Sequence, residues 1–500
     1  MSLTISLGLL GLILVFLSSM IFKRYSALQT LGFMHEKPEF PFGNLRGIGI
    51  KHHMIHILAR TYNKFSKISS VHGLYAFLNT TFVVTDLDLV KDILVNNFDV
   101  FQNRGLFNSK EHDPLSAHLA ALEDQEWRKM RQILTPTYTS GKMKMMFNTV
   151  LSVSNQMIEK LKANDNLEAV EVREVIASFM TDVIGNIAFG LEMHAIEDPN
   201  SEFRKMGRKV FGSDNFLGKI LLFSNFRSLA RKLRFQLFPP DVSNFFRQLV
   251  KDTVEYRREN NIERDDMLNL LMKIGTEGRK GEEKLTMDEI TAQCFLFFVG
   301  GFETSSSTST FTLFNLSENL DVQDKLRDEI KLVLARHDNE ITYEAMREMK
   351  YLDMVINETL RIYPPGAIAI REASRDYKVP NTKLIIPKSS MVFIPIYSIQ
   401  RDPEFYPDPE KFDSQRFTEE NIAKRHPMSH IPFCYGPRNC IGYRYGLMQI
   451  KIALIQLLIN FRFTKTSQTP EKIIYNLKNP VLSPATDIIL KLQKISSNNE

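Results

Sequence analysis

The chain has 500 residues, of which 43% are hydrophobic and 24% are charged. This composition excludes an intrinsically disordered protein and provides the apolar material for a large core. The net charge of +5 is too mild to indicate a nucleic-acid-binding protein, and the three cysteines offer no disulfide framework and agree with a reducing compartment.

The chain begins with an apolar segment, Leu3 to Phe22, that contains no charged residue. As a helix it would span about 30 Å, the thickness of the hydrocarbon core of a bilayer. Lys23 and Arg24 follow directly, which places the rest of the chain on the cytosolic side. A cleaved signal peptide is the alternative, but the segment lacks a basic n-region and exceeds a typical apolar core. We predict a membrane anchor over residues 1–24.

Residues 25–50 are rich in proline and glycine and are expected to form a hinge behind the anchor. His52 to Phe65 has the pattern of a helix, and Val71 to Thr85 contains two short strand-like runs. The segment Phe216 to Phe238 holds five basic residues, five phenylalanines and no acid. It fits either a membrane-interface segment or an amphipathic surface helix.

Two short patterns in the middle of the chain offer polar chemistry. Trp127 and Arg131 lie four residues apart, so on a helix they share a face and present two donors to an anion. A long helix is expected from Thr286, and its paired glycines 300–301 precede Glu303 and Thr304. Two adjacent glycines destabilise a helix, so they indicate a groove, with a carboxylate and a hydroxyl to supply protons. The alternatives are a packed tryptophan beside an incidental arginine, and a helix kink with a surface acid.

A turn near the carboxyl end carries the third cysteine. Gly436 and Pro437 predict a tight turn before Cys440, and apolar residues recur at helical spacing from Ile441. Cys440 is therefore expected close to the amino end of a buried helix, where the helix dipole favours the thiolate. A buried structural cysteine is the alternative. Upstream, Glu358 and Arg361 have the spacing of an ion pair on one helix face.

These patterns together resemble the cytochrome P450 family over nearly the whole chain. The haem-ligand loop of that family, Phe-x-x-Gly-x-Arg-x-Cys-x-Gly, is matched by Phe433, Gly436, Arg438, Cys440 and Gly442. Its Trp-x-x-x-Arg, Ala/Gly-Gly-x-Asp/Glu-Thr and Glu-x-x-Arg motifs fall on the residues described above. The chain departs from the family at Cys434, where glycine is usual, and at Ser414-Gln415, where Pro-Glu usually precedes the retained Arg416 and Phe417.

The resemblance implies a mainly α fold with small β-sheets, behind a single N-terminal transmembrane helix. Residues 51–500 would form one haem-binding monooxygenase domain, with haem b as cofactor and the Cys440 thiolate as its iron ligand. The further cofactor-binding residues that it implies are Phe433, Trp127, Arg131, Arg371, Arg438 and Arg104. The catalytic residues that it implies are Glu303 and Thr304, which would serve the protonation of dioxygen.

The implied enzyme inserts one oxygen atom from O2 into lipophilic small molecules, with foreign compounds among the candidates. Its electrons would come from NADPH through NADPH–cytochrome P450 reductase, with cytochrome b5 as a second donor. The loop Arg-Asn-Cys-Ile-Gly with Met448-Gln449 is similar to the insect microsomal branch, which implies the endoplasmic reticulum membrane and a cytosolic catalytic domain. The alternatives are a haem-thiolate isomerase or dehydratase that does not use O2, against which the Glu303–Thr304 pair argues, and a non-catalytic haem-binding membrane protein.

Two surfaces are also expected. A lipophilic pocket should be lined by the loop after Arg104 and by Phe297, Phe302, residues 367–370, Val481 and Leu482. A positive docking face for an acidic reductase should comprise Arg128, Lys129, Lys142, Lys144, Arg438 and Arg444.

Overall fold

The computed structural model describes residues 2–212, 215–264, 266–277 and 284–495. Its α-helices are α1 (Ser2–Tyr25), α2 (Ala27–Thr30), α3 (Met54–Phe65), α4 (Leu87–Lys91), α5 (Asp124–Leu134), α6 (Ser140–Lys162), α7 (Val172–Ile184), α8 (Glu202–Gly212), α9 (Phe216–Asn225), α10 (Arg227–Lys232), α11 (Pro240–Glu259), α12 (Met267–Glu277), α13 (Met287–Glu318), α14 (Leu320–Ala335), α15 (Tyr343–Glu348), α16 (Lys350–Ile362), α17 (Ile396–Ile399), α18 (Glu419–Ala423) and α19 (Tyr443–Asn460). Short π-helical turns are η1 (Asp92–Asn96) and η4 (Gly185–Phe189). Short 3-10 turns are η2 (Pro114–Ser116), η3 (Thr135–Tyr138), η5 (Ser414–Phe417) and η6 (Pro427–Ser429).

The strands are short and form small sheets. They are β1 (Val71–Ala76), β2 (Asn79–Val84), β3 (Val170–Glu171), β4 (Ala369–Glu372), β5 (Tyr377–Lys378), β6 (Ile385–Ile386), β7 (Met391–Ile394), β8 (Phe461–Lys465) and β9 (Ile489–Lys494). The largest sheet has the order β1-β2-β7-β4, with β1 antiparallel to β2 and β2 parallel to β7. The predicted mainly α fold with small sheets is confirmed, as are the helix ending at Phe65 and the two strands between Val71 and Thr85.

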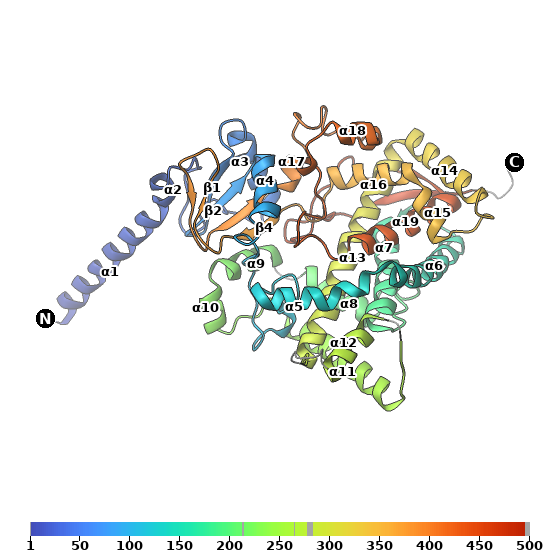
Figure 1. Cartoon of the computed structure of the whole chain (residues 1–500), viewed down its shortest axis with the longest axis horizontal. Coiled ribbons are helices and arrows are strands. Elements are labelled where there is room, and N and C mark those ends of the chain that lie inside the picture. Colours follow the sequence, from blue (N-terminus) through green and yellow to red (C-terminus); the bar gives the residue numbers. More distant parts are fainter. Residues whose placement is uncertain (1, 213–214, 265, 278–283, 496–500) are drawn as a thin grey trace.

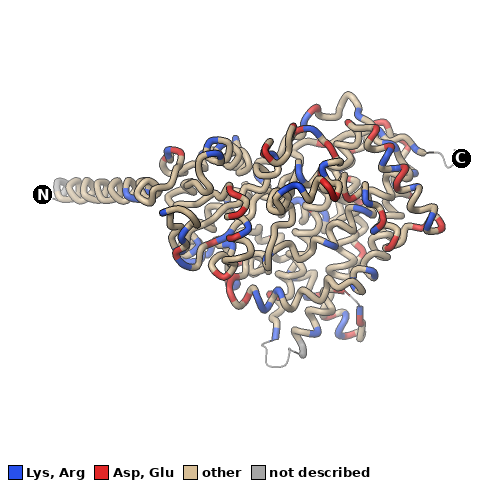
Figure 2. Tube along the Cα trace, turned by 45° about the horizontal axis from the view of Figure 1, so that its top comes forward, with Lys and Arg blue, Asp and Glu red and all other residues tan. Residues whose placement is uncertain are grey.

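Helix α1 projects from the body of the molecule, at the end that carries β1, β2 and β4 (Figure 1). Residues Ile5–Tyr25 have no buried share, and by length and composition this helix can cross a membrane. Basic side chains come only in its last turn, at Lys23 and Arg24 (Figure 2). An exposed apolar helix with basic residues at its base is consistent with a membrane anchor.

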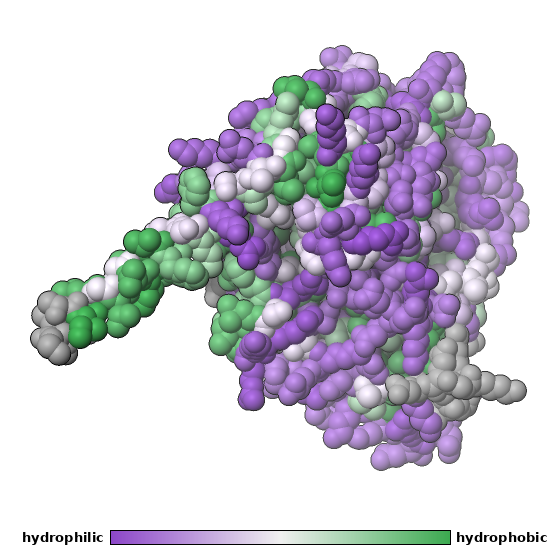
Figure 3. Space-filling view, turned by 60° about the vertical axis from the view of Figure 1, so that its left-hand side comes forward, coloured by the Kyte–Doolittle hydropathy of each residue, from purple (hydrophilic) through white to green (hydrophobic). Residues whose placement is uncertain are grey.

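A second apolar area lies on the body near the base of α1 (Figure 3). Helices α9 and α10, which replace the predicted segment 216–238, lie at this same end (Figure 1). The exposed apolar side chains here include Leu229 of α10 and Leu233, which directly follows α10, each with an exposed fraction of 54%. The apolar surface of α1 therefore continues onto the neighbouring part of the body.

Helix α13 is the central element of the core. It begins after Thr286, as predicted, and Thr286 with Glu289 forms a capping box. It packs against α7, α16 and α19, and most of its side chains are buried. A helix that is apolar on most sides belongs in the interior of a large domain. Its middle section therefore lies beside α19, the helix that follows Cys440.

A fully buried ion pair fixes the chain that leads to the Cys440 turn. Arg361 donates from Nε and Nη2 to the two carboxylate oxygens of Glu358 at 2.7 and 2.8 Å. Its Nη1 and Nη2 also donate to the carbonyls of Gln400 and Lys411, and Arg416 Nε lies 3.5 Å from the Glu358 carboxylate. The predicted triad is thus confirmed despite the Ser414-Gln415 departure. Breaking such a buried pair leaves an uncompensated charge, which typically costs about 3–5 kcal/mol.

A buried histidine in β1 makes the stability of the fold depend on pH. His72 is fully buried, neither ring nitrogen has a hydrogen-bond partner within the described residues, and burial lowers its pKa to about 4. The unfolded value is about 6.5. The native state therefore disfavours the protonated ring, so the stability that neutral His72 contributes is present above pH 6.5 and is lost as the pH falls towards 4.

We predict that His72→Phe weakens the loss of stability in acid. Between pH 7.5 and pH 5 the free energy of unfolding of the variant should fall by about 2 kcal/mol less than that of the wild type. Denaturant unfolding at the two pH values measures this difference. Because each protein is compared with itself at the two pH values, a pH-independent effect of the substitution on packing does not enter the result. Equal pH dependence of both proteins would contradict the assignment.

Candidate functional site

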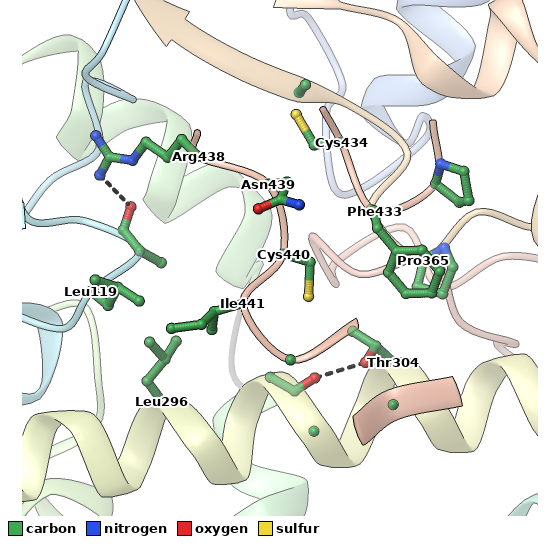
Figure 4. A pocket seen from close by; sticks show the side chains of 18 of the residues that line it. Leu119, Leu296, Thr304, Pro365, Phe433, Cys434, Arg438, Asn439, Cys440 and Ile441 are labelled. Atoms are coloured by element: carbon green, nitrogen blue, oxygen red, sulfur yellow. Dashed lines mark hydrogen bonds between the residues drawn. The ribbon is translucent and has the colours of Figure 1, made fainter. Parts of the chain in front are cut away.

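A cavity of about 440 Å³ lies between α13, α5, β4 and the Cys440 turn. Every predicted site residue except Glu303 lines it, namely Arg104, Trp127, Arg131, Thr304, Arg371, Phe433, Arg438 and Cys440. Cys440 comes from the turn on one side and Thr304 from α13 on the other (Figure 4). The fold thus brings together side chains that are more than 300 positions apart in the sequence.

The turn around Cys440 is held by main-chain and side-chain bonds. Gly436 has a φ of +78°, and a Cβ there would lie 2.0 Å from the carbonyl oxygen of Leu94, so only glycine fits. The backbone N–H of Cys440 donates to the carbonyl of Phe433 at 2.9 Å. Arg131 of α5 donates to both the carbonyl and the Oδ1 of Asn439 at 2.9 Å. The thiol of Cys440 is therefore presented on a fixed loop.

Burial raises the pKa of the Cys440 thiol, and the backbone N–H of Gly442 and the guanidinium groups of Arg104 and Arg131 oppose this shift. The expectation that a helix amino end favours the thiolate is therefore wrong in its net direction, because desolvation is the larger effect. α19 begins only at Tyr443, so the helix dipole acts on the sulfur from further away than expected. A coordinated metal cation reverses the balance, since it deprotonates a ligating thiol.

Cys434 shows why glycine is usual at its position. Its φ is +59°, in the left-handed region that a side chain disfavours. Its sulfur lies 3.3 Å from Nη2 of Arg371, which donates to it. The chain therefore accepts backbone strain here and gains a contact to a cavity arginine.

The cavity holds buried positive charge without a counterion. Burial, together with mutual repulsion, lowers the pKa of Arg438 to about 8 and of Arg104 to about 10. No carboxylate within the described residues forms an ion pair with Arg104, Arg371 or Arg438. The Nε atoms of Arg371 and Arg438 are buried and have no hydrogen-bond partner among the described residues. Such a cluster fits a ligand with anionic groups, as the propionates of a haem are.

Arg438 is 1% exposed and donates to the carbonyls of Gln102 and Leu122. Its guanidinium carbon lies 4.8 Å from the centre of the Trp127 ring. Arg438 therefore cannot belong to the docking face predicted for an acidic reductase, because its charge does not reach the surface. Its role inside the cavity remains a prediction.

The two glycines of α13 differ in function. A Cβ on Gly300 would meet no atom within 4 Å, so this residue opens the helix surface towards the cavity. A Cβ on Gly301 would lie 2.6 Å from Cδ1 of Ile184, so Gly301 allows α7 to pack closely. Thr304 Oγ1 donates to the carbonyl of Gly300 at 2.7 Å, as drawn in Figure 4. The expected groove is therefore made by Gly300 and bordered by Thr304.

Glu303 points away from the cavity. Its Oε1 accepts hydrogen bonds from Arg173 Nη2 and Asn479 Nδ2, both at 3.2 Å, and the residue is 4% exposed. Neighbouring residues of a helix project about 100° apart, and the Glu303 carboxylate lies on the side of α13 where Arg173 and Asn479 bind it. The structure therefore does not bring Glu303 together with the other predicted site residues.

Much of the remaining lining of the cavity is apolar and includes Leu106, Leu119, Leu296, Phe297, Ile368, Ala369 and Ile370. Four expected pocket residues, Phe302, Ala367, Val481 and Leu482, do not line it. Phe302 instead packs beneath Arg204, and Leu482 packs with Ala367 behind the wall.

The sequence interpretation missed Gln293, Ser305, Tyr138 and Tyr445 as lining residues. Helical spacing back from Thr304 would have found Gln293, but no local pattern marks the other three.

We predict that Gly436→Ala destabilises the protein, because the residue must adopt a positive φ and the new Cβ would collide with the Leu94 carbonyl. The expected loss is about 2 kcal/mol or more. The matched control is Gly141→Ala in the first turn of α6, where a Cβ meets no atom within 4 Å. Thermal unfolding measures both variants, and an equal effect of the two substitutions would contradict the geometry.

Comparison with known proteins agrees with this site. The sequence pattern of the family described as "Cytochrome P450" matches residues 36–492. The chain is 40% identical to "Probable cytochrome P450 6a14" of Drosophila melanogaster, over 98% of this chain and 99% of that protein. It is also 40% identical to "Cytochrome P450 6A1" of Musca domestica, over 93% of each chain. By its family pattern, its full-length relatives and its helical fold, the chain belongs to the cytochrome P450 family and is an enzyme of the monooxygenase class.

Proposed function

We propose that this protein is a membrane-bound haem-thiolate monooxygenase that binds haem b with the thiolate of Cys440 as axial ligand. One observation carries the proposal. The Cys440 thiol and the Thr304 hydroxyl lie on facing walls of one cavity (Figure 4), beside buried arginines that form no ion pair with a carboxylate of the described residues. A thiol, a hydroxyl and uncompensated guanidinium groups suit a metal-containing ligand with anionic arms.

Specific residues would hold this ligand. Arg104, Arg371 and Arg438 would donate to its propionates, and Trp127 and Arg131 line the same wall. Phe433, which accepts the backbone bond of Cys440, would pack beside the sulfur. When bound, the haem supplies a thiolate-ligated iron that activates dioxygen.

The chain's own residues would control protons and water. The Thr304 hydroxyl lies at the edge of the groove made by Gly300, and it would donate its proton to oxygen in the cavity when it rotates away from the Gly300 carbonyl. Apolar side chains exclude bulk water from that space. Glu303 lies behind the wall and pairs with Arg173, whose side chain is 29% exposed. We expect this pair to connect Thr304 to the protons of the solvent.

The substrate would be a lipophilic small molecule, because the free walls of the cavity are leucine, isoleucine and phenylalanine. Foreign compounds are candidates. We expect electrons from NADPH by way of NADPH–cytochrome P450 reductase, with cytochrome b5 as a second donor. We place the protein in the endoplasmic reticulum membrane, with residues 1–24 as anchor, 25–50 as hinge and 51–500 as a cytosolic catalytic domain.

The experiment that tests this function reconstitutes the full chain with the reductase in phospholipid vesicles. Candidate ligands are first screened for a change in the spin-state spectrum of the haem, and those that bind are offered with NADPH. Substrate oxidation that requires both NADPH and reductase is the expected result. Product formed without NADPH would indicate an isomerase or dehydratase, and ligand binding without any product would indicate a non-catalytic binding protein.

We predict that Cys440→Ser abolishes the red-shifted Soret band of the reduced, carbon monoxide-bound protein, because an alcohol does not replace a thiolate as ligand. Cys434→Ser is the matched control, since Cys434 lines the same cavity and changes by the same atom. The control should keep the band. Loss of the band in Cys434→Ser with Cys440 intact would mean that the ligand is misassigned.

We predict that deletion of residues 1–24 leaves the haem spectrum intact, because α1 projects from the body and contributes no residue to the cavity lining. The truncated protein should still attach partly to vesicles through the apolar side chains of α9 and α10. Leu229→Ser with Leu233→Ser in the truncated protein should weaken that attachment. Complete release of the truncated protein at low salt would contradict the membrane role of α9 and α10.

A further inference from the structure

The hydroxyl groups of α13 that line the cavity differ in their hydrogen-bond acceptors. Thr304 Oγ1 donates to the carbonyl of Gly300 at 2.7 Å, and Thr308 Oγ1 donates to the carbonyl of Thr304 at 2.8 Å. Both protons are held by the carbonyl four residues back, a frequent arrangement for threonine in a helix. Ser305 also lines the cavity, but among the hydrogen bonds of the described residues its hydroxyl is only an acceptor.

Gln449 of α19 explains this difference. Its Nε2 donates to the carbonyl of Gly301, four residues before Ser305, at 2.9 Å, and to Ser305 Oγ at 2.5 Å. A carbonyl oxygen has two acceptor positions, and the helix bond uses one of them. Because Gln449 takes the second, the Gly301 carbonyl is not open to the Ser305 proton. Ser306 donates to the carbonyl three residues back, but among the hydrogen bonds of the described residues Ser305 makes no such bond. The free direction for that proton is the cavity that Ser305 lines.

The orientation of the Gln449 amide is fixed by its partners. The Gly301 carbonyl can only accept, so the amide nitrogen and not its oxygen must face α13. Gln449 is fully buried, and its Oε1 has no partner within the described residues. An unpaired buried oxygen is unfavourable, so the favourable part of this contact is the pair of hydrogen bonds that Gln449 Nε2 donates. It connects the helix behind Cys440 to the groove of α13.

We propose that Ser305 is a second proton donor of the cavity and that Gln449 is the residue that positions it. The proposal rests on the proposed monooxygenase function. With the haem bound, Ser305 Oγ would donate its proton to oxygen in the cavity, and it would regain a proton from cavity water. NADPH supplies the electron pair and the solvent supplies the protons, so the serine is unchanged after each turnover.

The first test measures product formed per NADPH consumed, with peroxide assayed in parallel, for the reconstituted full chain. Ser305→Ala and Gln449→Met should each lower this ratio about two- to tenfold, the population change that one net hydrogen bond supports. Gln456→Met is the matched control, because Gln456 is buried on the same helix and donates to Asn155 at 2.6 Å, away from the cavity. The control should keep the wild-type ratio.

Two further variants separate positioning from loss of structure. If Gln449 acts through Ser305, the double variant Ser305→Ala with Gln449→Met should be no worse than Ser305→Ala alone. Ser305→Thr keeps the hydroxyl and should keep most of the ratio. An additive loss in the double variant, or a wild-type ratio in Ser305→Ala, would overturn the proposal.

The second test does not require turnover. The infrared C–O stretching band of the reduced, carbon monoxide-bound protein reports hydrogen-bond donors in the cavity. Gln449→Met should shift or broaden this band, because the Ser305 hydroxyl can then turn back to the Gly301 carbonyl, whereas Gln456→Met should not. The same band in both variants would contradict the positioning role. If Gln449→Met fails to retain haem, Gln449→Leu, which also removes the donor, replaces it.

The two tests also separate this inference from the proposed function. Absence of any NADPH-dependent product in the wild type would reject the monooxygenase proposal, and the protein would then carry no proton donor of this kind. A productive wild type with unaffected Ser305 and Gln449 variants would reject only the inference.

Discussion

The site depends on buried positive charge that no carboxylate of the described residues compensates. Arg104, Arg371 and Arg438 bring positive charge into one cavity wall, and no carboxylate of the described residues pairs with any of them. Burial and mutual repulsion lower the pKa of Arg104 and Arg438, which shows how unfavourable the arrangement is. An anionic cofactor that binds there would remove that cost, so cofactor binding and folding stability are linked.

Another buried arginine, Arg361, differs from this cluster because a carboxylate compensates its charge. Arg361 has the Glu358 carboxylate at hydrogen-bond distance and two main-chain carbonyls beside it. It serves the scaffold, because it fixes the loop that leads to the Cys440 turn. The same residue type thus has two roles that only the presence or absence of a carboxylate distinguishes.

Within little more than one turn of α13, some residues pack against neighbouring elements and others face the cavity. Gly301 is small because α7 packs against it, whereas Gly300 is small because the cavity lies beside it. Glu303 turns to Arg173 and Asn479, while Thr304 and Ser305 face the cavity. The hydroxyl of Thr304 is bonded within the helix and that of Ser305 is not, because Gln449 occupies the carbonyl that would accept its proton. The hydrogen bonds of these two hydroxyls therefore involve two helices, α13 and α19.

The sequence by itself determined the features that follow from local spacing. The apolar run before Lys23, the helix ending at Phe65, the start of α13 after Thr286 and the pair Glu358–Arg361 all depend on residues close in the chain, and the structure has them as predicted. The family followed from the pattern around Cys440 for the same reason. Short-range periodicity and turn chemistry act within a few residues, so they can be read without a fold.

Only the tertiary structure decided which side chains meet. It turned Glu303 out of the cavity, buried Arg438 away from the surface, and replaced Phe302 and Leu482 with other lining residues. It also raised the pKa of Cys440, where the helix end alone suggested the opposite. Desolvation and long-range hydrogen bonds depend on what packs against a residue from elsewhere in the chain. Gln449 reaches Ser305 across 144 positions, and no local pattern encodes that contact.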